Sequence, residues 1–490
     1  MNYKIQDQDQ SPQEIQESQT ALNDYSQYSE EESEKDVPTI LSDLISLCNI
    51  TQSSTEEEEI ELTLTQIKKC TNELIKNNYQ MLKDINFDIE PNHFDALIFS
   101  LSYLNYVSLS DNRFENPKIQ LILAIMQIFD QNPPLIDYLL TSQVIEPFFK
   151  IYNGFFKGWL KDLLIKILYS SEAAATFFIS HGMIDNLLTF FTSTLSRIEN
   201  LNQDQIKELN QYWIAVILIL EELVKMPFLD PDNLNKIGMF AAQFLSKDFL
   251  NISKGLVAKS ISLIYFCLSN PNWTLEFNLD AHFDLFVEAM EIDEWPFKKP
   301  IFDLFGKLCM KVYQWNPGFI VRWSQEALKW CENIDRNSIL YISSFFDFIS
   351  SVLEYQFEIF DQLQELDFFH QTYLIIHNSP FQYQMHLYNL ILSLTTPQLW
   401  VKAYPYFNEN SIITDLILFL QTKIDIPLKI KIICSLNQIC MNEMNELAIP
   451  EIAGCIDDEI QNAIDDEQND ELSAAYDTFL KTFRSIMSET

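Results

Sequence analysis

The sequence predicts an all-α chain whose helices repeat along its length and stack on one another. Residues 133–152 (PPLIDYLLTSQVIEPFFKIY) match residues 172–191 (EAAATFFISHGMIDNLLTFF) at a spacing of 39 residues. A fixed spacing of roughly 20 to 50 residues is typical of helical repeat arrays. Segments that alternate apolar and polar residues are nearly absent, and glycine occurs only 8 times in 490 residues. This composition disfavours β-hairpins and glycine-rich phosphate loops.

The chain begins with a polar, acidic segment. Residues 1–36 contain ten acidic and two basic residues, and such a segment buries too little apolar surface to offset the entropy lost on ordering. We therefore predict a disordered acidic tail over 1–36 and a helical array over 37–445. An acidic C-terminal segment with a terminal helix follows over 446–490, and we expect cuts before about residue 37 or after about residue 472 to be tolerated.

Within the array, apolar residues recur at helical spacing, and Pro, Asn or Asp clusters interrupt them. Short amphipathic helices are predicted at 181–191, 234–245, 279–290, 318–328 and 410–420. Longer apolar helices are predicted at 155–170, 203–226, 253–270, 297–314, 335–356, 380–396 and 426–445.

The self-match also predicts which side chains lie between repeats. One copy contributes Phe177, Phe178, Ile184, Leu187 and Leu188, and the other contributes Tyr138, Leu139, Ile145, Phe148 and Phe149.

The order of two short helices and one long helix, at roughly 38–53 residues per unit, resembles armadillo repeats. In that family SHGMIDNLLTFF (180–191) corresponds to the glycine turn that leads into the second helix of a repeat, and NSIITDLILFL (410–420) overlays it. The resemblance covers about residues 90–445 and implies an armadillo-type α-solenoid, a right-handed superhelix of stacked repeats. Two-helix HEAT-type units remain an alternative for the C-terminal half.

Nuclear-import adaptors of this family, such as importin alpha, present a Trp and, four residues later, an Asn on successive third helices, where the pair holds a basic peptide. No Asn stands four residues after a Trp in this chain, and its N-terminal tail is acidic where that of the adaptors is basic. The resemblance therefore carries no site residue over. The positions four residues after each Trp are Leu163, Ile217, Phe277, Lys299, Phe319, Ala327, Ile334 and Tyr404.

The net charge of −38 bears on partners. Nucleic acids and anionic membranes are bound through Lys and Arg, which are scarce here, so we expect neither as a partner. Residues 432–480 contain twelve acidic residues and no basic one, and an acidic field attracts basic proteins. We therefore expect a protein partner with a basic segment; nothing in the sequence indicates an oligomeric state.

Features of targeting are also scarce. The first 35 residues contain no apolar run typical of a secretory signal, and the longest apolar run, WIAVILIL (213–220), is far shorter than a membrane span. The eight cysteines form no CxxC pair, as in reduced core cysteines. We expect a cytoplasmic or nuclear protein, or one present in both compartments.

No catalytic or cofactor motif occurs, including GxSxG, HExxH, the P-loop and GxGxxG. His370 and His377 are seven residues apart, whereas two zinc ligands on one helix usually lie four apart. The acidic residues between Asp457 and Glu471 lack the order of a calcium loop, and we expect a solvated tail or helix face there. We predict no enzyme activity, metal or cofactor; the alternative is an enzyme whose site no motif reveals.

One polar row stands out on the long helix predicted at 335–356. Ser343, Asp347, Ser350 and Glu354 follow helical spacing in ILYISSFFDFISSVLEY. We predict that this row binds a protein ligand, the alternative being a solvent-facing stripe. The predicted function is a non-enzymatic scaffold or adaptor that binds a protein segment in its groove. The alternative is a regulatory subunit or nuclear-transport-type adaptor without the Trp/Asn array.

Overall fold

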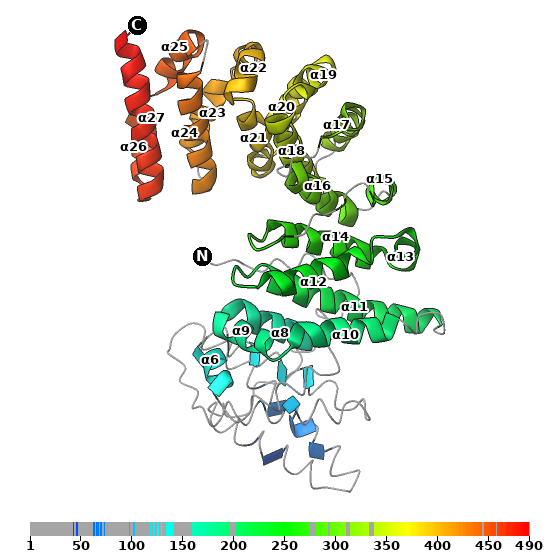
Figure 1. Ribbon diagram of the computed structural model, residues 1–490. Coiled ribbons are helices and arrows are strands. Elements are labelled where there is room, and N and C mark those ends of the chain that lie inside the picture. Colours follow the sequence, from blue (N-terminus) through cyan, green and yellow to red (C-terminus); the bar gives the residue numbers. More distant parts are fainter. Residues whose placement is uncertain are drawn as a thin grey trace. The chain divides into compact units, whose positions relative to one another are not determined.

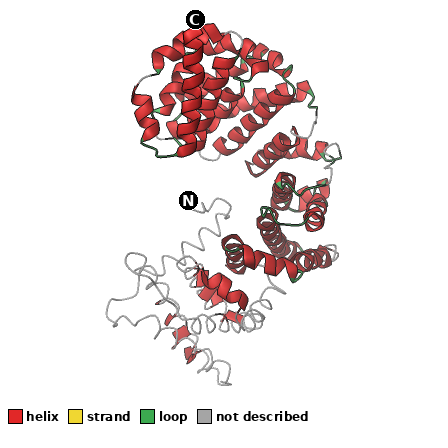
Figure 2. Cartoon of the chain, turned by 60° about the vertical axis from the view of Figure 1, so that its left-hand side comes forward, coloured by secondary structure: helices red, strands yellow, loops and turns green. Residues whose placement is uncertain are grey.

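The computed structural model describes two compact units, Met1–Tyr152 and Asn153–Thr490. In the first unit it describes residues 134–141 and short pieces between 43 and 129. In the second it describes 159–195, 202–274, 278, 281–292, 295–309, 314–332, 338–422, 424–442, 445–456 and 458–489. All elements in these ranges are helices (Figures 1 and 2). The predicted all-α class is confirmed.

The first unit is described mainly through α6 (Pro134–Thr141), in which Leu135, Ile136 and Leu139 are buried. In the second unit, α8 (Trp159–Ser170) precedes a series of helices that repeat in a common order. The helices that follow α8 are α9 (Glu172–Ser180), α10 (Met183–Leu195), α11 (Gln203–Val224), α12 (Pro231–Ala242), α13 (Lys247–Ile252), α14 (Lys254–Ser269), α15 (Phe283–Glu291), α16 (Trp295–Cys309), α17 (Pro317–Cys331), α18 (Ser338–Tyr355), α19 (Ile359–Glu365), α20 (Phe368–Asn378), α21 (Phe381–Ser393), α22 (Pro397–Glu409), α23 (Ile412–Leu420), α24 (Ile426–Met441), α25 (Asn445–Cys455), α26 (Asp458–Asp465) and α27 (Asp470–Glu489).

The repeating order is short, short, long. The final helices of successive repeats begin at residues 159, 203, 254, 295, 338, 381, 426 and 470, which are 41 to 51 residues apart. Each of these helices packs against the next one along the chain (Figure 1). The last three repeats, α19–α21, α22–α24 and α25–α27, have three helices each, whereas α17–α18 is a pair in the described residues. Stacked helical repeats, predicted from the 39-residue self-match, are confirmed.

The turn between the two short helices has a recurring backbone conformation. Gly182, between α9 and α10, has φ 77°, and Asp367 and Ser411 occupy the equivalent turns with φ 56° and φ 53°. Glycine adopts this left-handed region without cost, whereas other residues adopt it rarely. The overlay of 410–420 on 181–191 therefore aligned Ser411 with Gly182 correctly, although only one of them is glycine.

Polar side chains at the helix starts explain several boundaries. Asn202 caps α11 in a reciprocal capping box with Gln205, and Asp230 caps α12, which begins with Pro231. Ser171 caps α9 by accepting a hydrogen bond from the backbone N–H of Ala174 (3.1 Å). Such caps satisfy N–H groups that have no partner within the helix. They make α12 begin three residues before its predicted start.

The predicted core residues are only partly correct. Phe178, Ile184, Leu187 and Leu139 are buried, as predicted. The prediction is wrong for three of the others, because Phe177, Leu188 and Tyr138 are only half-buried. Phe177 turns outward and stacks on His181 at a ring-centroid distance of 4.0 Å. Ile145, Phe148 and Phe149 lie outside the described residues.

Hydrogen bonds tie each repeat to the one before it. The carboxamide of Asn270 donates to the carbonyls of Val224 (2.7 Å) and Met226 (3.0 Å), 46 and 44 residues earlier. Asn442 donates in the same way to the Thr395 carbonyl (2.9 Å), 47 residues earlier. These bonds recur near the repeat length, so they join neighbouring units and not distant ones.

The C-terminal helix belongs to this stack. Leu472, Tyr476 and Phe479 of α27 are buried, and α27 packs against α24. Glu467 accepts a hydrogen bond from the buried ammonium of Lys429 in α24 (2.7 Å). A cut after about residue 472, which the sequence predicts to be tolerated, would remove most of this apolar face. The expectation of a purely solvated acidic cluster is wrong at Glu467.

Candidate functional site

The predicted row Ser343, Asp347, Ser350 and Glu354 lies on α18. Asp347 and Glu354 are exposed, and Ser343 and Ser350 are half-buried. The hydroxyl of Ser350 donates to the Phe346 carbonyl of its own helix (2.8 Å). Asp347 of this row contacts the following repeat.

Asp347 begins a chain of hydrogen bonds through three successive long helices. Asn389 of α21 donates through Nδ2 to Oδ1 of Asp347 (3.1 Å). Lys431 of α24 donates through Nζ to Oδ1 of Asn389 (3.1 Å). Each step spans 42 residues. The carboxamide of Asn389 thus bridges an acid on one side and a base on the other.

The same face continues toward the N-terminus of the second unit. On α16, Lys299 donates to Asp303 at 2.6 Å, and both lie close enough to Asp347 to act on its charge. On α14, burial raises the pKa of Tyr265, and the charges of Asp303, Lys299 and Asp347 lie close enough to contribute. The row of polar residues therefore crosses α14, α16, α18, α21 and α24.

A second polar group joins the end of α11 to α14. Lys225 lies 2.7 Å from Glu222 and 3.4 Å from Glu221. The ammonium of Lys225 also lies 4.5 Å from the centre of the Phe266 ring on α14. This is a cation–π contact between neighbouring repeats. We call the set the polar track; its members are Glu221, Glu222, Lys225, Lys259, Tyr265, Lys299, Asp303, Asp347, Asn389 and Lys431.

Neighbouring helices partly shield the carboxyl groups of the track from water, although Asp347 as a residue is still exposed. Burial raises the pKa of Asp347 above its usual value, and hydrogen bonding from Asn389 and the charge of Lys431 counteract this only in part. Burial likewise raises the pKa of Glu221, with Lys225 and Lys259 acting in the opposite direction. Such carboxyls interact more strongly with a ligand than carboxyls in open water do.

Sequence reasoning missed the members of the track on other helices. Asn389 and Lys431 carry no motif of their own, and the prediction considered polar rows within one helix. The signal that identifies them is the repeat length, because residues one repeat apart on equivalent helices come together.

The tryptophans do not form the import-type array. Trp213, Trp315, Trp323 and Trp400 are buried, and Trp213 stacks on Phe191 at 5.0 Å. They serve the core between helices.

Side chains suited to metal binding do not cluster in the described part of the chain. No cluster of three or more His, Cys, Asp or Glu side chains is placed there to hold a metal ion. His370 forms a hydrogen bond with Asn410 (3.1 Å), and His377 lies 3.8 Å from Asp415. The two histidines therefore contact different residues of the next repeat. Burial raises the pKa of the Cys309 and Cys331 thiols to about 12, which keeps them protonated at neutral pH.

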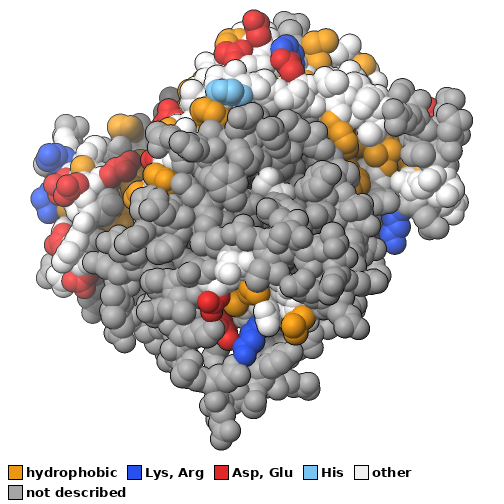
Figure 3. Space-filling model, turned by 90° about the horizontal axis from the view of Figure 1, so that it is seen from below, with side chains coloured by type: hydrophobic (Ala, Val, Ile, Leu, Met, Phe, Trp, Pro, Cys, Tyr) orange, Lys and Arg blue, Asp and Glu red, His pale blue; other side chains and the backbone are white. Residues whose placement is uncertain are grey.

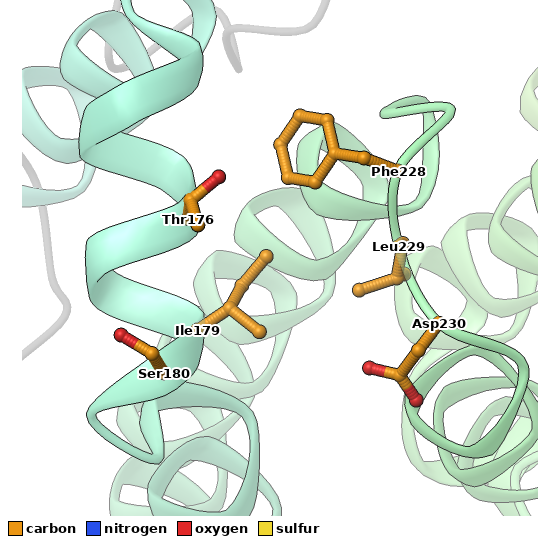
Figure 4. A pocket seen from close by; sticks show the side chains of 6 residues that line it. All are labelled: Thr176, Ile179, Ser180, Phe228, Leu229 and Asp230. Carbon is orange, nitrogen blue, oxygen red and sulfur yellow. The ribbon is translucent and has the colours of Figure 1, made fainter.

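A small hollow of about 160 Å³ lies between α9 and the loop before α12 (Figure 4). Thr176, Ile179 and Ser180 face Phe228, Leu229 and Asp230 across it. Asp230 already accepts hydrogen bonds from the backbone N–H (2.9 Å) and side chain (2.7 Å) of Asn233. The hollow is therefore a shallow apolar depression whose carboxylate is engaged in capping α12.

Figure 3 shows charged side chains of both signs among the described residues that are visible from below. In Figure 3 the described acidic and basic side chains lie among hydrophobic ones and do not separate by sign. No single helix among the described residues is long and apolar enough to cross a membrane, although the bent pair Leu160–Ser170 and Glu172–Ser180 passes on length and composition.

Comparison with known proteins shows similarity to solved structures but not to family models or curated proteins. No family model matches the chain, and no curated protein matches it. Among solved structures, the chain is similar to an engineered protein with a TM-score of 0.47 and 11% identity, over 90% of this chain and 99% of that one. It is also similar to SYS-1, with a TM-score of 0.42 and 10% identity, over 92% of this chain and 100% of SYS-1. The stacked, all-helical architecture of the described units matches the predicted resemblance to armadillo-like solenoids.

Proposed function

We propose that this chain is a non-enzymatic scaffold that binds a segment of another protein along the polar track. The observation that carries the proposal is the chain of contacts from Asp347 through Asn389 to Lys431. It places hydrogen-bonding groups on successive long helices, one repeat apart. A ligand that runs across several repeats meets such groups at regular intervals.

The burial pattern of the long helices supports this role. In α18, Phe345, Phe346 and Phe348 are buried, while Asp347 between them is exposed. The apolar side chains therefore hold the stack together and leave the polar ones for a partner.

The finer features of the fold belong to the same proposal. We propose an armadillo-type, right-handed superhelix, which the three-helix repeats α19–α21, α22–α24 and α25–α27 support. The acidic, polar composition of residues 1–36, which lie outside the described residues, supports a disordered tail there. The free, buried thiols of Cys267, Cys309 and Cys331 support a reducing compartment. We therefore place the protein in the cytoplasm, the nucleus or both.

The test compares three forms of the full chain in affinity purification. The track variant carries Asp347→Ala, Asn389→Ala and Lys431→Ala. The control variant carries Asp361→Ala and Lys402→Ala, which remove an exposed ion pair between α19 and α22 (2.7 Å) away from the track. Both should show wild-type helix content in far-ultraviolet circular dichroism.

We expect at least one protein to be retained by the wild type and the control and lost from the track variant. That protein, purified, should then bind the wild-type chain directly with the same dependence. If the track variant retains every partner, binding lies elsewhere and the proposal is wrong.

A further inference from the structure

The geometry points to a partner segment of near-zero net charge on the polar track. This inference rests on the proposed function and names the class of its ligand. It differs from the basic partner that the net charge of −38 predicts. The distinction matters because the track, and not the whole molecule, makes the contacts.

The charges of the track balance one another. Its ionisable acids and bases comprise four carboxylates and four lysines. The carboxylates are Glu221, Glu222, Asp303 and Asp347, and the lysines are Lys225, Lys259, Lys299 and Lys431. In a chain with 70 acidic and 32 basic residues, the track members thus balance in charge, and Glu354 of the same α18 row adds one exposed acid. The excess acidity lies outside the track.

The carboxylates are also engaged by groups of the protein itself. Lys299 binds Asp303, and Lys225 binds Glu222, at 2.6 and 2.7 Å. Asn389 binds Asp347. A basic ligand would have to displace these partners and would then meet lysines at the C-terminal end of α11 and on α14, α16 and α24. Like charges placed opposite one another oppose binding and serve to reject wrong partners.

A neutral polar segment neither displaces the lysines and the carboxamide that bind the carboxylates nor brings positive charge against the lysines of the track. Backbone amides and Ser, Thr, Asn or Gln side chains both donate and accept, as the carboxamide of Asn389 does between Asp347 and Lys431. Such a ligand can share these hydrogen bonds without bringing an unpaired charge onto partly buried carboxyls. The track therefore selects an extended segment by hydrogen bonding.

The size of the segment follows from helix packing. Neighbouring packed helices lie about 10 Å apart, so α16 to α24 span about 30 Å. An extended chain covers this with about 9 residues at about 3.3 Å each.

The experiment selects ligands without presuming their charge. A displayed library of random peptides of about 12 residues, enough for this span, is selected on the immobilised full chain at physiological salt. Clones that also bind the Asp347→Ala, Asn389→Ala, Lys431→Ala variant are discarded. Synthetic peptides from the remaining clones are then measured by fluorescence anisotropy at low and high salt, with the Asp361→Ala, Lys402→Ala variant as control.

We expect the track-dependent peptides to have net charges near zero and dissociation constants that change by no more than about twofold with salt, because screening acts on net charge. Enrichment of strongly basic peptides with salt-sensitive binding overturns the inference while leaving the proposed function in place. A selection that yields no track-dependent peptide overturns the proposed function itself.

Discussion

Replacing Gly238 by alanine tests the packing between α12 and the turn after α14. A Cβ atom at position 238 would lie 2.2 Å from Cη2 and 2.4 Å from Cζ3 of Trp273. Carbon atoms in contact normally lie about 3.5–4.0 Å apart, so the indole must move by more than 1 Å. Glycine inside a helix is otherwise unfavourable by roughly 0.5–1 kcal/mol relative to alanine. Glycine is explained at this position because the absence of a Cβ atom leaves room for the indole of Trp273.

The indole cannot move without disturbing the contact between repeats. The turn that carries it is held by Asn272, whose carboxamide donates to the carbonyls of Pro227 and Leu229, both at 2.9 Å. Overpacking of this kind costs about 1–3 kcal/mol, and the gain in helix propensity returns at most about 1 kcal/mol. Because the overlap with Trp273 is severe, the overpacking cost should lie in the upper part of its range, at about 2–3 kcal/mol, and Gly238→Ala should lower the free energy of unfolding by about 1–2 kcal/mol.

Urea denaturation followed by circular dichroism measures the effect. Gly454→Ala in α25 is the matched control, because a Cβ there meets no atom within 4 Å; it should leave stability unchanged or raise it slightly. In a Trp273→Ala background, Gly238→Ala should lose its cost, which a double-mutant cycle detects. If Gly238→Ala is as stable as the wild type, or equally harmful without Trp273, the packing argument is refuted.

Three other predictions follow from the second unit. Glu467→Ala should destabilise the chain toward the lower end of ~3–5 kcal/mol in urea denaturation, because it leaves the buried ammonium of Lys429 without this carboxylate; an effect below that of the exposed Lys402→Ala would contradict this. A thiol reagent at pH 8 should label Cys434, which is exposed, long before Cys331, whose pKa burial raises to about 12; mass spectrometry of peptides follows both, and equal rates would count against the described burial. A chain that stops at Asn469 should bind a hydrophobic dye and melt earlier than the full chain, because α24 loses the apolar face of α27; an unchanged melting curve would show α27 to be dispensable.

Much of the fold could be predicted because helical period and repeat length are local properties of the sequence. The long helix predicted at 203–226 is found at Gln203–Val224, and the one at 426–445 begins at the predicted residue. Side-chain direction was harder to predict. The self-match made Phe177 equivalent to Tyr138 and Phe178 equivalent to Leu139. It did not show that the first of these two positions is half-buried and the second buried.

The repeating turn conformation shows another limit. Glycine marks the left-handed turn at Gly182, but Asp367 and Ser411 hold the same conformation without it. The packing of the short helices on either side outweighs the strain of this conformation at Asp367 and Ser411. The residue types at these two positions do not by themselves predict a left-handed turn. Buried positions of α27 were also overlooked. Leu472, Tyr476 and Phe479 follow helical spacing, but the surrounding acidic residues dominate the composition.

Of the ten members of the polar track, only Asp347 was predicted from the sequence. The helical row on α18 identified Asp347, because one helix face can be read from a single segment. Asn389 and Lys431 depend on the contact between repeats, and a reader of isolated helices has no reason to join them. Taking the 42-residue step from Asp347 forward twice would have found both.

The contacts between neighbouring repeats bear on how the chain is made. The inter-repeat hydrogen bonds described here join residues 37 to 47 positions apart, as between Tyr373 and the Asn410 carbonyl or between Asn442 and Thr395. The entropy of closing a loop of that length is paid once per repeat and does not grow with the length of the protein. A ribosome adding about 5–20 residues per second completes each partner within seconds of the last. Each new repeat can therefore dock on a finished one during synthesis, and a stalled or shortened chain would end on an uncovered apolar face that chaperones recognise.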